Sequence, residues 1–496
     1  MRIGRRTALR GLAAAAALAT STRAGAVTSS SAKRMDTSQG EWPVYGGDHF
    51  SRKYSPLSQI SADTIANLEV GWIWDAPDNA IVASMRAKQP GFRTDNFKGT
   101  PIMVGGRLYI RTPLGIVQAL SPATGAVIWR HDPGGYSDEP PRSDGFTTRG
   151  VAYWQDEKGS GRILSTTSDR RLLALDAMTG APIPGFGDHG VVDLDATQRR
   201  LANSRWWMNY GNQVPVIVGD VAILGSVVTD NELGYPGADK MEQPQVPPGD
   251  VRGFDVRTGA RKWTFHSVPQ AGEFGAETWG DESWRWVGST NVWSLISADP
   301  ERGLVYLPFT SPTFNYYGGF RPGDNLFGDC LVCLDAKTGK RVWHFQTIHH
   351  SLFDYDLPAA PVLGEIMVGG RSIPAVIQVS KNGFSYVLNR VTGEPVWPIE
   401  ERAVPPSTIA GEKASATQPF PTAPPPFAAQ GMTSARINDL TPRLKAKVEE
   451  MLSRHDHGPL YTPVSERGTV LAPGISGGAN WPGGAFDPTT GMFYVT

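Results

Sequence analysis

The sequence predicts an all-β protein of the β-propeller type, and three observations lead to this prediction. A short apolar strand followed by a turn ending in Thr-Gly recurs along the 496-residue chain. In four copies a tryptophan follows the glycine by four positions. The 56 glycines and 40 prolines indicate many tight turns. Because a hairpin of this size cannot bury its apolar face alone, the copies are expected to pack on one another.

The repeated phrase is a hairpin whose second strand carries the tryptophan. The four complete copies end at Trp129, Trp263, Trp343 and Trp397, and a fifth, residues 174–180, has no tryptophan. The turn glycines lie about 54 to 80 residues apart, whereas a four-stranded blade takes about 40 to 50. The wider intervals therefore contain loop insertions, which is where we expect functional residues.

Further hairpins and one helix are expected between the copies. Residues 100–110 are two strands around Gly-Gly, and residues 374–379 lead to a turn at Asn382. Residues 441–453 form an amphipathic pattern with Thr441 as a candidate N-cap and a proline in the first turn. This pattern predicts a short helix.

The two cysteines, Cys330 and Cys333, have a spacing that also occurs in redox and metal sites. Both fall in a predicted strand, where residues three apart point to opposite faces. We therefore interpret them as buried apolar residues. The sequence contains no Cys-x-x-Cys-His, so no attached c-type haem is predicted.

Composition and the N-terminus limit the classes of function. A formal net charge of −1 argues against a nucleic-acid partner, which needs a basic face. Arg5 and Arg6 precede an apolar run, residues 11–19, that is much shorter than the roughly 20 residues of a membrane span. Residues 1–26 are therefore predicted to be a twin-arginine signal peptide that directs the protein to the periplasm.

The rest of the chain is divided into two regions. Residues 27–40 are rich in Ser, Thr and Ala and are expected to be a disordered linker. Residues 41–496 are expected to be the propeller domain. The sequence stops at residue 496 inside an apparent strand, so we expect a propeller that is incomplete at its C-terminus and lacks its last blade or blades.

Four phrases carry a family resemblance: residues 42–48, 149–154, 254–259 and 349–358. Together with the repeat, they resemble the quinoprotein dehydrogenases, which carry pyrroloquinoline quinone (PQQ). The resemblance extends over nearly all of the chain from Trp42 and is closer to the membrane glucose dehydrogenase branch, without its membrane helices. It implies an eight-bladed type of propeller whose blades are docked by tryptophans.

The resemblance assigns the catalytic residues. Asp354 matches the general base of the family, and hydride leaves a carbinol carbon readily only as the alcohol proton is removed. Lys381 matches a cation that lies against the quinone oxygens and stabilises the reduced ring. From the residues alone, Asp354 would be a solvated loop aspartate and Lys381 a surface lysine before an Asn-Gly turn.

The resemblance also implies cofactor and metal ligands. Arg149 matches an arginine that pairs with a cofactor carboxylate, and Trp293 matches the indole floor under the cofactor. Asn212 falls where the family has a Thr or Ser cofactor contact. The metal ligands implied are Asp230, Asn231 and Asp354, whose oxygens suit calcium or magnesium. A lanthanide is the less favoured ion, although Asp356 occurs where lanthanide-using relatives have an added carboxylate.

Several positions depart from the family pattern. Leu114 replaces a histidine of the glucose branch, Ser143 and Asp144 stand where the methanol branch has adjacent cysteines, and Ser311 replaces an asparagine metal ligand. Lys98 stands where a glutamate is expected. These differences leave the substrate open.

The sequence thus predicts an oxidoreductase that oxidises an alcohol, polyol or sugar hydroxyl by hydride transfer to PQQ. Electrons would leave to an external acceptor, either a cytochrome c or a membrane quinone. Two alternatives remain: a non-catalytic periplasmic propeller scaffold, and an inactive fragment of such an enzyme. The enzyme requires Arg149, Trp293, Asp354 and Lys381 to converge in one pocket, whereas a scaffold would scatter them.

Overall fold

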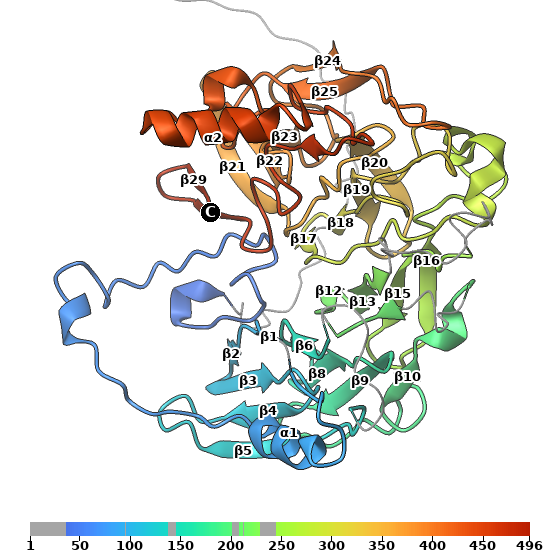
Figure 1. Cartoon of the computed structure of the whole chain (residues 1–496). Coiled ribbons are helices and arrows are strands. Elements are labelled where there is room, and N and C mark those ends of the chain that lie inside the picture. The colour runs from blue at the N-terminus through green and yellow to red at the C-terminus, as the bar shows by residue number, and fades with distance from the viewer. Residues whose placement is uncertain (1–35, 95, 137–144, 201–207, 212, 229–244) are drawn as a thin grey trace, which may run out of the picture. The chain divides into compact units, whose positions relative to one another are not determined.

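Antiparallel sheets make up most of the computed structural model, which describes residues 36–94, 96–136, 145–200, 208–211, 213–228 and 245–496. Four four-stranded sheets follow one another along the chain (Figure 1). Their strands are β2 (Ile102–Val104), β3 (Arg107–Arg111), β4 (Val117–Leu120) and β5 (Val127–His131); β7 (Ala152–Gln155), β8 (Gly161–Thr166), β9 (Arg171–Asp176) and β10 (Val191–Asp193); β12 (Val216–Val218), β13 (Val221–Leu224), β15 (Val251–Asp255) and β16 (Arg261–Phe265); and β17 (Ser297–Asp299), β18 (Leu304–Pro308), β19 (Cys330–Asp335) and β20 (Arg341–Gln346).

Smaller sheets follow or lie between these four. The three-stranded sheet consists of β21 (Val362–Val368), β22 (Arg371–Val379) and β23 (Ser385–Asn389). The two-stranded pairs are β24 (Ile399–Ala403) with β25 (Thr417–Pro421), β28 (Gly484–Asp487) with β29 (Met492–Val495), β11 (Met208–Asn209) with β14 (Val227–Val228), and two parallel pairs, β1 (Asn96–Phe97) with β6 (Thr147–Thr148) and β26 (Asp456–His457) with β27 (Thr469–Val470).

Helices are few and short in the described residues. They are α1 (Asp78–Arg86), α2 (Pro442–Leu452) and the 3₁₀ turns η1 (Thr37–Gln39), η2 (Ile65–Asn67), η3 (Asp195–Thr197), η5 (Ala276–Thr278), η6 (Gly280–Arg285) and η7 (Ser434–Arg436). The helix predicted for residues 441–453 is confirmed as α2. Its N-cap is Thr441, as predicted, since the Thr441 hydroxyl accepts a hydrogen bond from Leu444 N at 3.1 Å. Helix α1 was not predicted.

The repeated hairpin has a local physical cause. In the copy without tryptophan, Asp176 Oδ1 accepts hydrogen bonds from Thr179 N at 2.8 Å and from Thr179 Oγ1 at 2.9 Å. Gly180 follows with a φ of +74°, a conformation that glycine adopts without steric cost. The same arrangement recurs at Asp255 and at Asp335. The Asp-x-x-Thr-Gly phrase therefore closes each turn by itself.

Tryptophans of the repeat lie against turn glycines of the next sheet. Trp129 Nε1 donates to Ala177 O at 3.0 Å, and a Cβ added to Gly180 would lie 2.4 Å from the Trp129 ring. Equivalent contacts join Trp263 to Gly339 and Trp343 to Gly393. A side chain larger than hydrogen would collide with the indole at each of these positions.

Two contacts of this kind differ from the sequence pattern. Gly259 faces the sheet of β7 to β10, whose copy of the repeat lacks the tryptophan after its turn, and there Val192 and Phe186 occupy the place of the indole. At the other end of the series, Trp72, which the repeat did not predict, lies against Gly125 and donates to Pro122 O at 3.0 Å.

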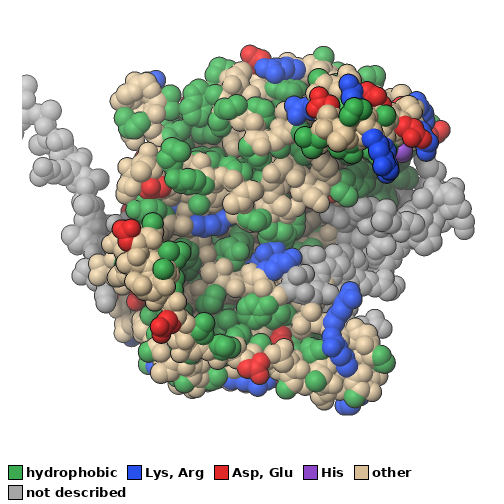
Figure 2. Space-filling model, turned by 60° about the vertical axis from the view of Figure 1, so that its left-hand side comes forward, with side chains coloured by type: hydrophobic (Ala, Val, Ile, Leu, Met, Phe, Trp, Pro, Cys, Tyr) green, Lys and Arg blue, Asp and Glu red, His purple; other side chains and the backbone are tan. Residues whose placement is uncertain are grey.

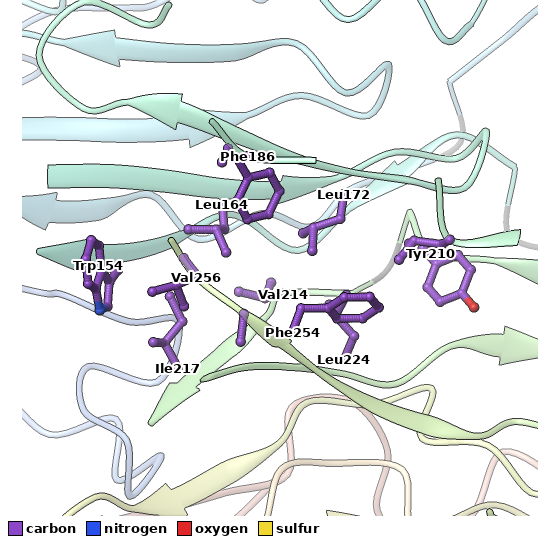
Figure 3. Packing of buried hydrophobic residues seen from close by; sticks show 14 of the residues in the cluster. Trp154, Leu164, Leu172, Phe186, Tyr210, Val214, Ile217, Leu224, Phe254 and Val256 are labelled. Atoms are coloured by element: carbon purple, nitrogen blue, oxygen red, sulfur yellow. The ribbon is translucent and has the colours of Figure 1, made fainter. Parts of the chain in front are cut away.

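The hydrophobic core lies between successive sheets. Figure 3 shows one cluster, in which side chains of β8 and β9 face those of β12, β13 and β15. The central members are Leu164, Leu172, Ile217, Leu224 and Phe254. Cys330 and Cys333 of β19 are free and fully buried, as predicted, and they lie in two different core clusters.

A segment near the N-terminus, residues 42–53, joins sheets that are far apart in the sequence, and we call it the strap. Trp42 exchanges two backbone hydrogen bonds with Met103 of β2. Further along, carbonyl groups of the strap accept hydrogen bonds from the first strands of later sheets, from Ala298 N of β17 at 2.8 Å and from Leu363 N of β21 at 2.9 Å. Arg52 O accepts from β28 in the same way.

The predicted signal peptide and most of the predicted linker lie outside the described residues. Within the linker range, residues 37–39 form η1, since Asp36 accepts a hydrogen bond from Ser38 N and Gly40 N donates to Thr37 O. None of the helices in the described part of the chain combines the length and apolar character that a membrane span requires. On the face shown in Figure 2, charged side chains of both signs are scattered among hydrophobic ones.

Candidate active site

Four of the predicted site residues lie in loops that lead into or out of strands. Arg149 precedes β7, Trp293 precedes β17, and Asp354 precedes β21. Lys381 follows β22, which pairs with β21 in the antiparallel sense, so that the end of β22 lies beside the start of β21. Loops at the ends of rigid strands are suitable places for side chains that must meet.

Asp354 and Lys381 are in direct contact. Lys381 Nζ lies 3.1 Å from Asp354 Oδ1 and 3.4 Å from Asp356 Oδ2. The side chains are largely buried, with exposed fractions of 7% for Lys381, 16% for Asp354 and 4% for Asp356. Asp354 also has a φ of +54°, which is uncommon for a residue with a side chain and occurs at functional sites.

Two further residues contact the Asp354 carboxylate, and sequence reasoning missed both. Asn315 Nδ2 donates to Asp354 Oδ1 at 3.1 Å, and the Tyr316 hydroxyl donates to Asp354 Oδ2 at 3.2 Å. Both belong to the loop between β18 and β19. No motif marked this loop; the only available signal was that it is one of the insertions between repeats.

A buried contact between His350 and Glu412 holds this loop. His350 Nε2 lies 2.7 Å from Glu412 Oε1, and both side chains are 2% exposed. Glu412 also accepts from Gly318 N, two residues beyond Tyr316. Burial acts to raise the pKa of Glu412, but the hydrogen bonds from His350 and Gly318 outweigh it and leave the pKa below its ordinary value. The loop that carries Asn315 and Tyr316 is thus anchored at a charged contact.

Indole rings connect the acid and lysine to Arg149. Lys381 Nζ lies 5.6 Å from the centroid of Trp293, and Trp293 contacts Trp481 edge-on with centroids 4.5 Å apart and an interplanar angle of 85°. Arg149 Cζ lies 3.4 Å from the centroid of Trp481. Arg149, Trp293, Asp354 and Lys381 therefore belong to one continuous cluster, and Trp481 completes it. The only sequence signal for Trp481 was its position in a glycine-rich stretch.

Asp356 contacts Lys381 through Oδ2 and a buried polar cluster through Oδ1. Its Oδ1 accepts hydrogen bonds from Ser311 N and Ser311 Oγ, each at 3.1 Å. Ser311 Oγ also lies 3.0 Å from Asp329 Oδ1. Burial, and then the neighbouring charge of Asp356, raise the pKa of Asp329 well above its ordinary value. Ser311 therefore acts as a hydrogen-bond partner of carboxylates in this chain.

Not all predicted ligands can be placed. Asn212, Asp230 and Asn231 lie outside the described residues. Within the described ranges, no group of three or more His, Cys, Asp or Glu side chains is arranged to hold a metal ion. Leu114 is buried in an apolar cluster with Phe92 and other residues next to α1.

The site has unsatisfied polar atoms that fit an aromatic, polar ligand. Among the residues that the structure describes, Asn315 Oδ1 and Trp293 Nε1 are buried without a hydrogen-bond partner. A buried polar atom left unpaired costs about 1–3 kcal/mol. The site could bind a flat, anionic redox cofactor, because its two indoles can stack on a planar ring and its lysine and arginine can pair with negative charges.

The chain forms successive antiparallel sheets, and its charged and indole side chains gather in the loops beside the first strands. This arrangement is that of a β-propeller protein with a site at the ends of its strands. A family model described as "PQQ: Glucose/ethanol/alcohol dehydrogenase, beta-propeller domain" matches residues 42–496. The chain belongs to this family of PQQ-dependent quinoprotein dehydrogenases, and the predicted resemblance to them is confirmed.

Curated relatives have similar sequences and longer chains. The quinoprotein glucose dehydrogenase of Escherichia coli K12 is 32% identical over 90% of this chain and 54% of its own length. The glycerol dehydrogenase large subunit of Gluconobacter oxydans 621H is 30% identical over 91% of this chain and 59% of its own. The chain thus spans between half and two thirds of these relatives.

Solved structures have the same fold. The quinohemoprotein alcohol dehydrogenase of Pseudomonas putida HK5 superposes with a TM-score of 0.63 at 23% identity, covering 93% of this chain and 57% of the other. A europium-containing methanol dehydrogenase gives a TM-score of 0.60 at 21% identity, covering 92% and 68%. These similarities support the propeller fold.

Proposed function

We propose that this protein is a quinoprotein dehydrogenase that oxidises an alcohol, polyol or sugar hydroxyl by hydride transfer to PQQ. The observation that carries the proposal is the single cluster formed by Asp354, Lys381, Trp293 and Arg149. Membership of the family supports it, as do relatives named for glucose and glycerol oxidation. A non-catalytic scaffold gives no reason for these four side chains to meet.

Asp354 is the proton acceptor in this proposal. Lys381 and Asn315 hold Oδ1, and Oδ2 lies beside the Tyr316 hydroxyl. The substrate O–H proton passes to this carboxylate while the C–H hydrogen leaves with its electron pair, and the product is a carbonyl compound. When bound, PQQ supplies the two-electron acceptor for that hydride.

The other residues bind and orient. The Lys381 ammonium lies against both Asp354 and Asp356, so that its positive charge is held at a fixed position beside the indole of Trp293. Trp293 and Trp481 provide apolar ring surface that excludes water. Arg149 offers a guanidinium fork for a cofactor carboxylate.

We propose that a divalent metal ion, calcium or magnesium, is held by Asp354 together with Asp230 and Asn231. A lanthanide remains the less favoured ion. In the structure, Asp356 accepts hydrogen bonds from Lys381 and Ser311, which gives this carboxylate a role that requires no metal.

The finer features of fold and cellular location are also proposals. We propose that the propeller is of the eight-bladed type, with the tryptophan–glycine contacts as the docking points between blades, and that its domain covers residues 41–496 after a linker at 27–40. Residues 1–26 would direct export through the twin-arginine pathway to the periplasm. There, a cytochrome c or a membrane quinone would accept the electrons, with no nucleic-acid partner.

Reconstitution tests the function directly. Purified protein is incubated with PQQ and calcium, and dye reduction is measured with a panel of alcohols, polyols and sugars. We expect at least one substrate to reduce the dye, and the Asp354→Asn variant to bind PQQ without doing so. If the folded protein binds no PQQ, the proposal is wrong; if it binds PQQ but oxidises no hydroxyl compound, the inactive-fragment alternative holds.

A further inference from the structure

Arg111, the last residue of β3, is a fully buried arginine with one edge of its guanidinium unused. Its Nη1 donates to Gly211 O at 2.6 Å and lies 3.4 Å from Thr148 Oγ1. Its Nε and Nη2 are buried and have no hydrogen-bond partner in the described ranges. The side chain is 0% exposed.

Other buried arginines of the chain are better satisfied. Arg390 pairs with Asp299 at 2.9 Å and with Glu365 at 2.8 Å. Arg321 donates to three acceptors, namely Asn325 Oδ1, Phe314 O and Ser351 O. Burial lowers the pKa of Arg111 to about 10, so the group remains positively charged at neutral pH. Burying a charge without a partner is costly.

The carboxylate that interacts electrostatically with Arg111, that of Asp78, does not complete the site. Asp78, at the start of α1, is buried and its electrostatic interaction with Arg111 is weak compared with its own desolvation, which raises the Asp78 pKa above its ordinary value. Asp78 Oδ2 accepts from Leu114 N at 3.0 Å instead. The unused edge of Arg111 therefore still needs an acceptor.

The position of Arg111 connects it to the proposed cofactor site. Thr148, which its Nη1 contacts, directly precedes Arg149, and consecutive Cα atoms are 3.8 Å apart. Thr148 Oγ1 also donates to Arg111 O at 3.0 Å, which fixes this approach. The Ser168 hydroxyl, which a Cβ added to Gly211 would approach to 2.7 Å, is buried and has no partner among the described residues. Unused donors thus gather next to Arg149.

We propose that Arg111 is a second anion-binding residue of the site, which together with Arg149 receives the carboxylate groups of a flat polycarboxylate, PQQ. The inference rests on the proposed function. Nε and Nη2 form one side of the guanidinium plane, and two parallel N–H donors of this kind match the two oxygens of a carboxylate. A cofactor with several carboxylates can use two arginines at once.

The test is the affinity of the metal-supplemented protein for PQQ, followed by quenching of tryptophan fluorescence. Losing a charge-assisted hydrogen-bonded pair is expected to weaken binding about 10- to 100-fold in Arg111→Met. Arg107→Met is the matched control, because Arg107 lies on the same strand and donates to Met178 O on the surface. It should bind PQQ as the unchanged protein does.

The trimethyl ester of PQQ shows whether the carboxylate is the group recognised. Arg111→Met should change the affinity for the ester less than about threefold, since the ester carries no charge for the guanidinium to pair with. Equal weakening for acid and ester would overturn the inference, because it would indicate a structural role. Unchanged binding of PQQ would overturn it as well.

A conservative variant covers the case in which Arg111→Met does not fold. Arg111→Lys keeps the charge but loses the paired donors, so it should fold and show intermediate affinity for PQQ and unchanged affinity for the ester. If Arg111→Lys binds both compounds like the unchanged protein, the inference fails. If the unchanged protein itself binds no PQQ, the proposed function fails instead, so the two failures are distinguishable.

Discussion

Replacing Tyr316 by phenylalanine tests the assignment of Asp354 as proton acceptor. The Tyr316 hydroxyl donates to Asp354 Oδ2 at 3.2 Å, and the variant removes that oxygen and little else. A hydrogen bond to a charged group contributes about 1.5–3 kcal/mol. Asp354 is 16% exposed, so water can partly replace the hydroxyl, and we take about 1–2 kcal/mol. This loss corresponds to a decrease of about 5- to 30-fold in kcat/KM.

The neighbouring tyrosine is the matched control for this experiment. Tyr317 donates to Ala410 O at 3.3 Å rather than to Asp354, so Tyr317→Phe should keep kcat/KM within about twofold. The assay is dye reduction by the PQQ-loaded protein, with PQQ affinity measured in parallel and expected to be unchanged in both variants. If Tyr317→Phe lost as much activity as Tyr316→Phe, the hydrogen bond to Asp354 could not be the cause.

Three further outcomes are expected. Asp354→Asn should lower kcat about 10²- to 10⁴-fold while the affinity for PQQ, measured by fluorescence, stays within about threefold. A smaller decrease in kcat would show that another residue is the general base. Gly339→Ala should lower the free energy of unfolding by about 2–5 kcal/mol in urea, because a Cβ there would lie 2.5 Å from the Trp263 ring in a left-handed conformation; an unchanged midpoint would contradict the close contact. Burial acts to raise the pKa of Asp299, but hydrogen bonds from Arg390 and Arg302 leave it below 3.8. Asp299 therefore stabilises the fold above about pH 4 and loses this contribution as the pH falls through its lowered pKa, so the stability difference between the unchanged protein and Asp299→Asn should shrink on acidification; a difference independent of pH would exclude this linkage.

Local features of the fold were predictable from the sequence. The hairpin turns depend on hydrogen bonds between residues three or four apart, such as Asp176 with Thr179, and the cap of α2 joins Thr441 to Leu444. Because both partners of such a hydrogen bond lie in one short sequence motif, and the motif recurs along the chain, the turns can be recognised from the sequence. The all-β class and the helix were predicted on this basis and are confirmed.

The candidate site was only partly predictable, because its contacts join distant segments. Tyr316 contacts Asp354 from 38 positions away, and Trp481, in the loop between β27 and β28, contacts Trp293 in the loop before β17. Contacts between residues so far apart in the sequence leave no local sequence pattern. Arg111 was missed for a related reason: in an apolar strand it has the pattern of a residue that points to solvent, and only the packing of Thr148 and Gly211 around it reveals that it is buried.

The strap has a consequence for how the chain is made. Lys53 Nζ donates to Gly484 O at 3.1 Å, a partner 431 residues further along. At a translation rate of about 5–20 residues per second, the ribosome needs roughly 20–90 s to deliver that partner after the strap has emerged. During this interval residues 42–53 of the nascent chain lack these later neighbours, so the contact between Lys53 and Gly484 can form only after residue 484 has been synthesised.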